Sequence, residues 1–409
     1  MRLLTGAAHR AAALFVSALA ALAILMPVLP AAATPAAAMP MTLERVGPAL
    51  AHPWGMEFLT SDSLLVTTRG GALWKIGLAD GAATRITGTP DVYARRQGGL
   101  LDVAAIDGHV YLCYSAILPG GSATAIDRAV IEGDRLVRRR TIFTGNAATK
   151  SGHHFGCRLY VNGTALWATL GDRGDRDNGQ DPSTHAASII RLTPDGDAHP
   201  GNPHITDKAK AGWAPEIFSI GHRNPQGLAM NPMTGEMWSH EHGPRGGDEI
   251  NILRPAIDAG ANYGWPAVSQ GREYATGLRV SRHDSLPGFV DPVWVWVPSI
   301  APSGMAFYPD EAGGDGSDAM SPAPMFPEWR GHLLVGSLKF RRLYLVEIGD
   351  DGLPASERVI LDGGIGDGGI GRIRDVAVGP DGPFAGAVFL LSDEAQGGLW
   401  RLASDQAAR

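Results

Sequence analysis

Short apolar segments recur along the whole chain, and no long stretch shows the 3.6-residue spacing of an amphipathic helix. Turns rich in Gly, Asp and Pro separate these segments, as is typical of consecutive short strands. The pattern therefore predicts an all-β fold. The segments lie at residues 64–68, 109–115, 165–170, 236–241, 332–338, 342–348, 387–393 and 398–403.

A weak internal repeat accompanies these segments, and most of its copies lead through a turn into one of them. The copies begin at Trp54, Gly98, Phe155, Gln226, Ser303 and Arg374. Six copies predict six sheets arranged radially, which protects strand edges in a long all-β chain. We expect one six-bladed β-propeller over residues 39–409. Two stacked sandwiches are the alternative, but no linker interrupts the middle of the chain. Residues 308–329 read as a surface insertion within a blade.

Composition agrees with a large globular domain. The chain has 409 residues, 44% hydrophobic and 19% charged, and its 54 Gly and 29 Pro suit many tight turns. The net charge of −7 offers no general attraction for nucleic acid or an anionic membrane, so neither is expected as a partner. The basic cluster at residues 135–140 is interpreted as a solvated face.

The N-terminus has the pattern of a targeting segment. Two arginines precede an apolar run at residues 11–30, and small residues typical of a cleavage site follow it. We expect a signal peptide over residues 1–38 for Sec-type export, with cleavage between about residues 34 and 41. A membrane anchor is the alternative, but two prolines and the Ala-rich exit favour cleavage. The mature protein would then be periplasmic or secreted, without stable membrane insertion.

The chain contains two cysteines, Cys113 and Cys157. In an oxidising compartment they could pair, but sequence alone does not bring the two sulfurs together. Cys113 lies in an apolar segment, so a buried free thiol is an equal alternative. No CxxCH motif is present, which argues against covalent haem.

Polar clusters are spread over the entire chain. In a propeller the loops of every blade meet at the mouth of the central channel, so distant clusters can converge there. We expect a binding site built from residues 95–99, 152–156, 171–181, 221–227, 240–249, 337–342 and 371–375.

These clusters belong to longer motifs that occur in one order. They include RQGGLLDV, HFGCRL, GDRG, GHRNPQG, EHGPRGGDEIN, NYGWP, PSIAPSGMAFY, FPEWRGHLLVGSLKFRRL, RIRDVAVGPDG and LLSDE. With them the chain resembles the soluble aldose sugar dehydrogenases of the glucose/sorbosone dehydrogenase family over about residues 53–402. The resemblance implies a periplasmic six-bladed propeller that oxidises aldoses with pyrroloquinoline quinone (PQQ) and calcium.

PQQ is a planar ortho-quinone with three carboxylates, and arginine side chains bind carboxylates with paired donors. For any single arginine taken alone, a surface salt bridge is the ordinary alternative. The resemblance implies that the cofactor is bound by Gln97, Arg223, Asn224, Gln226, Lys339, Arg372 and Arg374.

Sugar oxidation needs a base that removes the anomeric hydroxyl proton, and histidine suits this role near neutral pH. His154 matches the family's base, and we favour it over His153 because it directly precedes the Phe-Gly pair. Neighbouring strand residues face opposite ways, so only one of the two reaches the pocket. Asp172 is expected to orient this histidine, with a simple turn aspartate as the alternative.

Calcium prefers hard oxygen ligands, including backbone carbonyls. The resemblance implies that the carbonyls of Gly243 and Pro244 hold a calcium ion that touches the quinone. It implies a second, structural calcium at Glu249 and the Tyr263 carbonyl.

Three further features concern metal, sugar and cofactor contacts. His240 and His242 are spaced as a zinc pair, but a third ligand is missing. Tyr274 matches a position near the sugar. Trp265 could stack on the sugar or cofactor, although core packing is the commoner use of tryptophan.

Two other functions compete with the dehydrogenase hypothesis: a calcium-dependent propeller lactonase and a non-catalytic sugar-binding propeller. A lactonase does not need the many basic residues that a tricarboxylate demands. A decayed, non-catalytic site is disfavoured because the set is intact: Gln97, His154, Arg223, Asn224, Lys339, Arg372 and Arg374. A GxGxxG pattern at Gly364, Gly366 and Gly369 lacks the βαβ context of a dinucleotide site and is interpreted as a loop. The electron acceptor, a cytochrome or a quinone, is not identified by the sequence.

Overall fold

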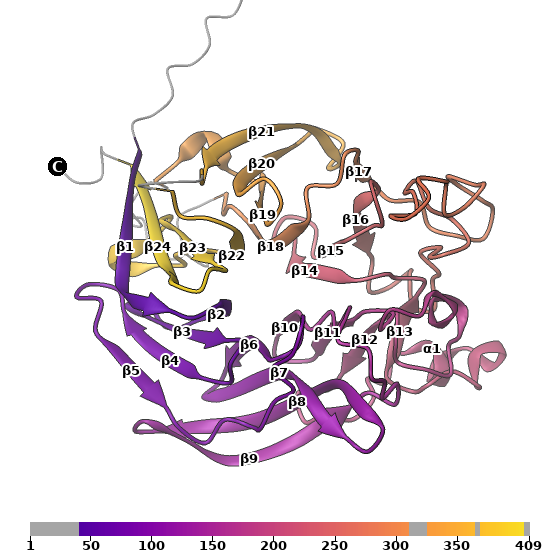
Figure 1. Ribbon diagram of the computed structural model, residues 1–409, viewed down its shortest axis with the longest axis horizontal. Helices are drawn as coiled ribbons and strands as arrows, with labels where there is room; N and C mark the ends of the chain where they lie inside the picture. The colour runs from indigo at the N-terminus through magenta and orange to yellow at the C-terminus, as the bar shows by residue number, and fades with distance from the viewer. Residues whose placement is uncertain (1–40, 311–324, 365–368, 405–409) are drawn as a thin grey trace, which may run out of the picture. The chain divides into compact units, whose positions relative to one another are not determined.

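The computed structural model describes residues 41–310, 325–364 and 369–404, which form six four-stranded antiparallel sheets. The sheets are arranged radially, each with its first strand near the centre (Figure 1). The described part of the chain is therefore a six-bladed β-propeller, as predicted from the repeat.

The first three blades are continuous in sequence. Blade 1 contains β2 (Pro53–Thr60), β3 (Ser63–Thr68), β4 (Leu73–Gly77) and β5 (Ala83–Ile86). Blade 2 contains β6 (Leu100–Ile106), β7 (His109–Leu118), β8 (Gly121–Glu132) and β9 (Arg135–Thr144). Blade 3 contains β10 (Leu159–Val161), β11 (Leu166–Leu170), β12 (Ser188–Leu192) and β13 (Ile217–Ile220).

Blades 4 and 5 follow the same order, and blade 6 closes the ring. Blade 4 contains β14 (Pro225–Met230), β15 (Met237–Glu241), β16 (Asp248–Leu253) and β17 (Trp294–Trp296). Blade 5 contains β18 (Pro302–Phe307), β19 (Leu333–Ser337), β20 (Arg342–Ile348) and β21 (Pro354–Asp362). Blade 6 contains β22 (Ile373–Val378), β23 (Val388–Ser392) and β24 (Gly397–Ser404), completed by β1 (Met41–Leu50).

Helical structure is limited to single turns in the described residues. They are η1 (Arg176–Gln180), α1 (Pro203–Thr206), η2 (Lys208–Lys210), η3 (Pro327–Trp329) and η4 (Gly382–Phe384). None of these helices is long and apolar enough to cross a membrane.

The ring closes through pairing of the first described strand with the last. β1 lies antiparallel to β24, from Met41 opposite Ser404 to Leu50 opposite Gly397 (Figure 1). This closure satisfies the edge of blade 6 with a strand from the other end of the chain. No local pattern in the sequence predicts this pairing.

The six repeat copies coincide with the inner strands β2, β6, β10, β14, β18 and β22 or their immediate approach. The second strands β3, β11, β15, β19 and β23 are buried along their whole length. Apolar side chains fill the space between neighbouring blades; Trp238 of blade 4, for example, packs edge-on against Phe307 of blade 5.

Cys113 of β7 and Cys157, just before β10, form a disulfide. Both residues are fully buried. The disulfide therefore joins blade 2 to the segment that enters blade 3, and it resolves the alternative that the sequence left open.

Some expectations concern residues outside those described. They are the signal peptide, residues 311–324 of the expected insertion, and Gly366 of the GxGxxG pattern. The described parts of the glycine-rich segment lie between two strands, β21 and β22.

Candidate active site

A cavity of about 460 Å³ lies where the inner strands of all six blades begin. It brings together most of the residues predicted to bind a cofactor, although they lie far apart in sequence. Six of the seven line it: Gln97, Asn224, Gln226, Lys339, Arg372 and Arg374.

The cavity is strongly cationic. Arg69 and Arg341 join Lys339, Arg372 and Arg374 in its wall, and no Asp or Glu is among its lining residues. The Nε atoms of Arg69 and Arg374 are buried, yet no hydrogen-bond partner is found for them among the described residues. Unmet donors on buried cations favour an anionic ligand that carries several acceptor oxygens.

Arg374 is held in place by a network at the channel wall. Its guanidinium donates to Gln226 Oε1 at 3.2 Å and to Asp393 Oδ2 at 2.8 Å. Burial would raise the pKa of Asp393, but Arg374, with smaller contributions from His52 and Arg372, holds it well below its usual range. Trp54 presents its ring to the guanidiniums of Arg158 and Arg374, at 4.3 and 5.5 Å. This fixes a flat aromatic surface in the cavity wall.

Arg223 is the predicted cofactor ligand that does not line the cavity. Its Nη1 donates to the carbonyls of His242 and Gly243, at 2.8 and 2.7 Å. Its guanidinium also lies 5.3 Å from the centre of the Trp265 ring. The backbone amides of Arg223 and Asn224 both donate to the buried carboxylate of Glu241, which explains the shape of this turn.

His154 and Asp172 lie beside the cavity as a hydrogen-bonded pair. His154 Nδ1 is 2.6 Å from Asp172 Oδ1, and its backbone amide donates to Gln97 Oε1 at 2.7 Å. His153, in contrast, is exposed, and its Nε2 lies 3.4 Å from Arg96 Nη1. The geometry therefore favours His154 as the histidine of the site.

Asp172 is braced on both carboxylate oxygens. The Gly174 amide donates to Oδ1 at 2.7 Å, and Trp265 Nε1 donates to Oδ2 at 3.0 Å. Burial would raise the pKa of Asp172, but the bond to His154, the charges of His154 and Arg223, and the Gly174 amide lower it overall. Asp172 thus stays ionised and fixes the orientation of the imidazole. Trp265 makes this contact rather than lining the cavity.

The predicted metal ligands form two groups. The Gly243 carbonyl accepts from Arg223, and the Pro244 carbonyl accepts from Ser299 Oγ at 3.2 Å. The carboxylate of Asp248 is used by the amides of Gly243 and Ala301. Both carbonyl oxygens of Gly243 and Pro244 therefore already accept a hydrogen bond. While Arg223 donates to Gly243, a cation could bind these two carbonyls only through the lone pairs that are not used in hydrogen bonds.

Glu249 and Tyr263 form the second group, on two sides of Glu241. Glu249 pairs in register with Glu241 across β15 and β16, and Tyr263 stacks on His222, which bonds to Glu241. Burial raises the pKa of Glu249 to about 8, and the neighbouring Glu241 adds to the shift. Two adjacent carboxylates are oxygen donors of the kind that a hard cation prefers.

The remaining predicted residues have separate positions. Tyr274 is 68% exposed in the loop between β16 and β17, outside the cavity wall. His240 is fully buried, whereas His242 lines the cavity and contacts the Pro302 carbonyl. No three His, Cys, Asp or Glu side chains cluster as a metal site in the part of the chain that the structure describes.

Four cavity residues lie outside the clusters predicted from sequence: Trp54, Arg69, Leu101 and Ala301. His242 and Arg341 lie inside those clusters, but no role in binding the cofactor was predicted for them. Arg69 follows β3 directly and His242 follows β15 directly, just as Asp172 and Lys339 follow β11 and β19 within two residues. Arg69 and His242 could therefore have been predicted from their positions, because polar residues that directly follow the second strand of a blade reach this site.

The family model for glucose/sorbosone dehydrogenases matches residues 50–401. The chain is 36% identical over 367 residues to the aldose sugar dehydrogenase YliI of Escherichia coli, covering 86% of this chain and 90% of that protein. Among solved structures, the soluble aldose sugar dehydrogenase of Escherichia coli in its apo-form has a TM-score of 0.77 at 34% identity. That match covers 89% of this chain and 100% of the other.

The PQQ-bound aldose sugar dehydrogenase of Streptomyces coelicolor has a TM-score of 0.68 at 25% identity, with 89% of this chain and 98% of the other covered. The fold and site thus define a propeller sugar dehydrogenase. The chain belongs to the glucose/sorbosone dehydrogenase family, which confirms the resemblance seen in the sequence motifs.

Proposed function

We propose that this protein oxidises aldose sugars at the anomeric carbon to lactones, with PQQ as cofactor and calcium as its metal. The observation that carries the proposal is the cavity itself. Five cationic side chains and no carboxylate line it, and the His154–Asp172 pair lies beside it. A tricarboxylate cofactor matches this charge, and the PQQ-bound relative from Streptomyces coelicolor adds support.

The cofactor would be held by Gln97, Asn224, Gln226, Lys339, Arg372 and Arg374, with Arg69 and Arg341 supplying further positive charge. Arg223 would join them if its guanidinium turned from the Gly243 carbonyl toward the cavity. The chemistry that PQQ supplies when bound is acceptance of a hydride at its quinone.

His154 is the proposed base. Its Nδ1–H donates to Asp172, which leaves Nε2 without a proton and able to accept one. His154 Nε2 takes the proton of the anomeric hydroxyl while the C1 hydride leaves the sugar, and the C1–O bond becomes the lactone carbonyl. Asp172 holds the tautomer and stabilises the imidazolium that forms.

Two calcium sites belong to the same proposal. Glu249 and the Tyr263 carbonyl would hold a structural ion, which would offset the adjacent Glu241 and Glu249 carboxylates. The Gly243 and Pro244 carbonyls would hold an ion at the cofactor, and this requires Arg223 to release Gly243. We therefore expect binding of calcium there to be coupled to the position of Arg223.

We also propose that the chain is exported by a signal peptide over residues 1–38 and functions in the periplasm as one propeller domain over residues 39–409. The buried Cys113–Cys157 disulfide supports an oxidising compartment.

The test is reconstitution. The purified mature chain is titrated with PQQ and followed by ultraviolet-visible spectroscopy, and dye reduction is then measured with a panel of aldoses. We expect saturable PQQ binding and dye reduction that requires PQQ, calcium and an aldose together. The lactone is identified by mass spectrometry of the product.

Failure of PQQ to bind would overturn the proposal. Hydrolysis of lactones by the chain in calcium without PQQ would instead assign it to the propeller lactonases. Binding without turnover on any aldose would contradict the catalytic part and leave a sugar- or cofactor-binding propeller.

A further inference from the structure

Three arginines lie side by side near the mouth of the cavity. Arg245 pairs with Arg272, and Arg272 pairs with Arg279, each in an antiparallel bridge. Directly opposed residues on antiparallel segments project to the same side, about 5 Å apart at Cβ, and like charges placed this way are destabilising. Backbone hydrogen bonds between Arg245 and Arg272 hold the bridge, but the three like charges gain nothing from their closeness. An anionic partner outside the chain would offset this repulsion.

Neighbouring acids neutralise little of this charge. Arg279 pairs with Asp284, while Glu273 is taken by Arg176 at 2.8 Å. Among the described residues, Arg245 and Arg282 have no acidic partner, and the Arg272 guanidinium donates only to the Gly277 carbonyl. We call Arg245, Arg272, Arg279 and Arg282 the arginine rim. It carries excess positive charge on a chain whose net charge is −7.

The rim is connected to the cavity by short contacts. Pro244, next to Arg245, accepts a hydrogen bond from Ser299 Oγ, and the Ser299 carbonyl accepts from Lys339 Nζ at 2.9 Å. Lys339 lines the cavity. A molecule that rests on the rim is therefore next to the mouth through which electrons must leave.

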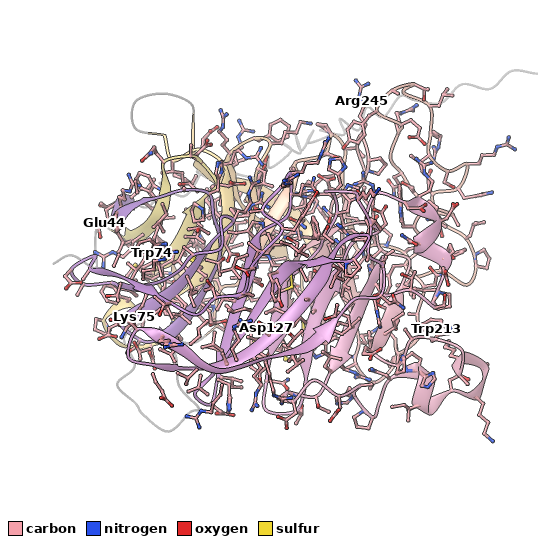
Figure 2. The ribbon with its side chains drawn as sticks, turned by 60° about the horizontal axis from the view of Figure 1, so that its bottom comes forward. Glu44, Trp74, Lys75, Asp127, Trp213 and Arg245 are labelled. Atoms are coloured by element: carbon pink, nitrogen blue, oxygen red, sulfur yellow. A yellow bond between two sulfur atoms is a disulfide. The ribbon has the colours of Figure 1, made fainter. Side chains whose placement is uncertain are left out.

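Large apolar side chains are exposed among the arginines. Tyr274, Leu278 and Val297 are 68%, 67% and 69% exposed. Arg245 itself lies at the top of the molecule in Figure 2, away from Lys75 on the lower side. Arginine and aromatic residues are enriched at protein–protein contact surfaces.

We propose that the arginine rim is the docking site of a small acidic redox protein that takes electrons from the bound cofactor, an inference that rests on the proposed function. Oxidation of one aldose to a lactone releases two electrons and two protons. A one-electron carrier, such as an oxidised c-type cytochrome, docks twice per turnover and takes one electron each time, while both protons pass to water. Opposite charges across such a contact mainly raise the association rate.

A bilayer is the other anionic surface to consider, but the structure favours a protein. The rim comes only from the β15–β16 and β16–β17 loops of blade 4, so it borders one side of the mouth. A small globular partner can rest on one side, whereas a flat membrane would lie across the whole rim of the propeller.

The first test measures binding without cofactor, so it does not depend on turnover. An acidic c-type cytochrome and a basic one are immobilised, and the dissociation constant of the cofactor-free chain is measured at low and at physiological salt. We expect the acidic cytochrome alone to bind, and the double variant R245E/R272E to weaken this binding by at least about tenfold. The double variant K75E/R138E makes the same change in net charge elsewhere and should bind as the wild type does.

The second test measures electron delivery by the PQQ-loaded chain. Turnover is followed with the acidic cytochrome, with ferricyanide and with hexaammineruthenium(III). R245E/R272E should lower kcat/KM for the cytochrome by at least about tenfold while turnover with hexaammineruthenium(III) is retained. L278S/V297S, which removes the apolar contacts and no charge, should slow only the cytochrome.

Four results would overturn the inference. If the acidic and basic cytochromes bind with equal affinity, charge complementarity does not drive docking. If K75E/R138E weakens cytochrome binding as much as R245E/R272E does, the effect comes from net charge and not from the arginine rim. Loss of ferricyanide turnover in step with the cytochrome, with L278S/V297S unchanged, would assign the rim to small anions. Sedimentation with phosphatidylglycerol vesicles that R245E/R272E abolishes would assign it to a membrane. Absence of PQQ turnover alone would contradict the proposed function and leave the binding test standing.

Discussion

At the scale of single residues, the hydrogen bonds around Asp172 bear most directly on the catalytic role of His154. Its two oxygens receive hydrogen bonds from the His154 ring, the Gly174 amide and the Trp265 indole. All of these favour the ionised carboxylate, which in turn keeps the proton of the histidine on Nδ1. The pair is therefore set up so that His154 Nε2 can act as a base.

Replacement of Asp172 by Asn should remove this control. The amide can present an N–H to His154 and favour the wrong tautomer, so kcat for aldose oxidation should fall by roughly 10²- to 10⁴-fold. The dissociation constant of PQQ, measured by absorbance titration, should stay near that of the wild type. Asp177→Asn, an exposed aspartate of the same loop, serves as the control. Equal activity of D172N and D177N would exclude an orienting role for Asp172.

Trp265 is predicted to act through Asp172. Trp265→Phe removes the donor to Oδ2 and raises the pKa of Asp172, which the native contacts hold below its ordinary value. Asp172 should therefore take up its proton at a higher pH than in the wild type as the solution is acidified. Carboxyl NMR shifts of Asp172 over a pH series measure this change, and kcat should fall because the weakened carboxylate orients His154 less well.

A purely structural role for Trp265 would lower kcat without changing the pH at which Asp172 is protonated. The matched control is Trp213→Phe, since Trp213 lies on the lower side of the molecule in Figure 2, in a different part from Arg245. Protonation of Asp172 at the same pH in W265F and in the wild type would contradict the positioning role.

At the scale of elements, the segment that carries His154 is held in an unusual backbone conformation. His154, Gly156 and Cys157 all have positive φ, at 51°, 64° and 75°. Residues other than glycine rarely adopt positive φ, so contacts with the surrounding structure must hold His154 and Cys157 in this conformation. The Cys157 amide bonds to the Thr169 carbonyl at 2.6 Å, and the disulfide ties the same residue to β7.

The double variant C113A/C157A should therefore affect both stability and catalysis. The disulfide spans 44 residues, for which chain-entropy arguments give a stabilisation of at most about 4 kcal/mol. We expect a lower midpoint in denaturant unfolding and a fall in kcat that exceeds any change in KM for the sugar, because His154 is less well placed. A stability loss with unchanged kcat would show that other contacts suffice to position the histidine.

The strand pattern explains what could be predicted from sequence. Each inner strand starts near a repeat copy, and residues that follow the second strands, such as Arg69 and Lys339, reach the cavity. Local pattern and motif therefore placed the blades and most of the cavity wall. Pairings between segments far apart in the chain could not be predicted from the sequence, because the register and the choice of partner strand depend on tertiary packing. The β1–β24 closure, the Cys113–Cys157 bond and the Arg245–Arg272–Arg279 bridges are of this kind.

At the scale of the whole molecule, the inner strands connect two cavities. Each strand begins at the cofactor cavity and continues to a second one of about 420 Å³ at the other end of the channel. Arg158 lies between Asp102 and Asp375 in that second cavity, at 3.3 and 2.9 Å, and Glu57 lines it as well. Two buried carboxylates thus share one arginine, and the half-buried Glu57 adds a third carboxylate to the same cavity wall.

This arrangement sets the direction in which stability depends on pH. Burial raises the pKa of Glu57 from 4.5 to about 8, with Asp102 and Asp375 adding to the shift. Between these values the folded state keeps a proton that the unfolded state has released. Stability gained from this group is therefore complete below about pH 4.5 and is lost as the pH rises toward 8.

Replacement of Glu57 by Gln should remove this loss, because the amide keeps the acceptor oxygen for the Phe58 amide and cannot ionise. At pH 5 the free energy of unfolding of E57Q and of the wild type should be similar. At pH 9 we expect E57Q to be the more stable by at least about 1 kcal/mol, since one unit of pKa shift corresponds to about 1.4 kcal/mol. Denaturant unfolding at both pH values measures the difference, with the exposed Glu328→Gln as control. Equal stability of E57Q and E328Q at pH 9 would mean that Glu57 ionises freely, and that the far end of the channel is open to water.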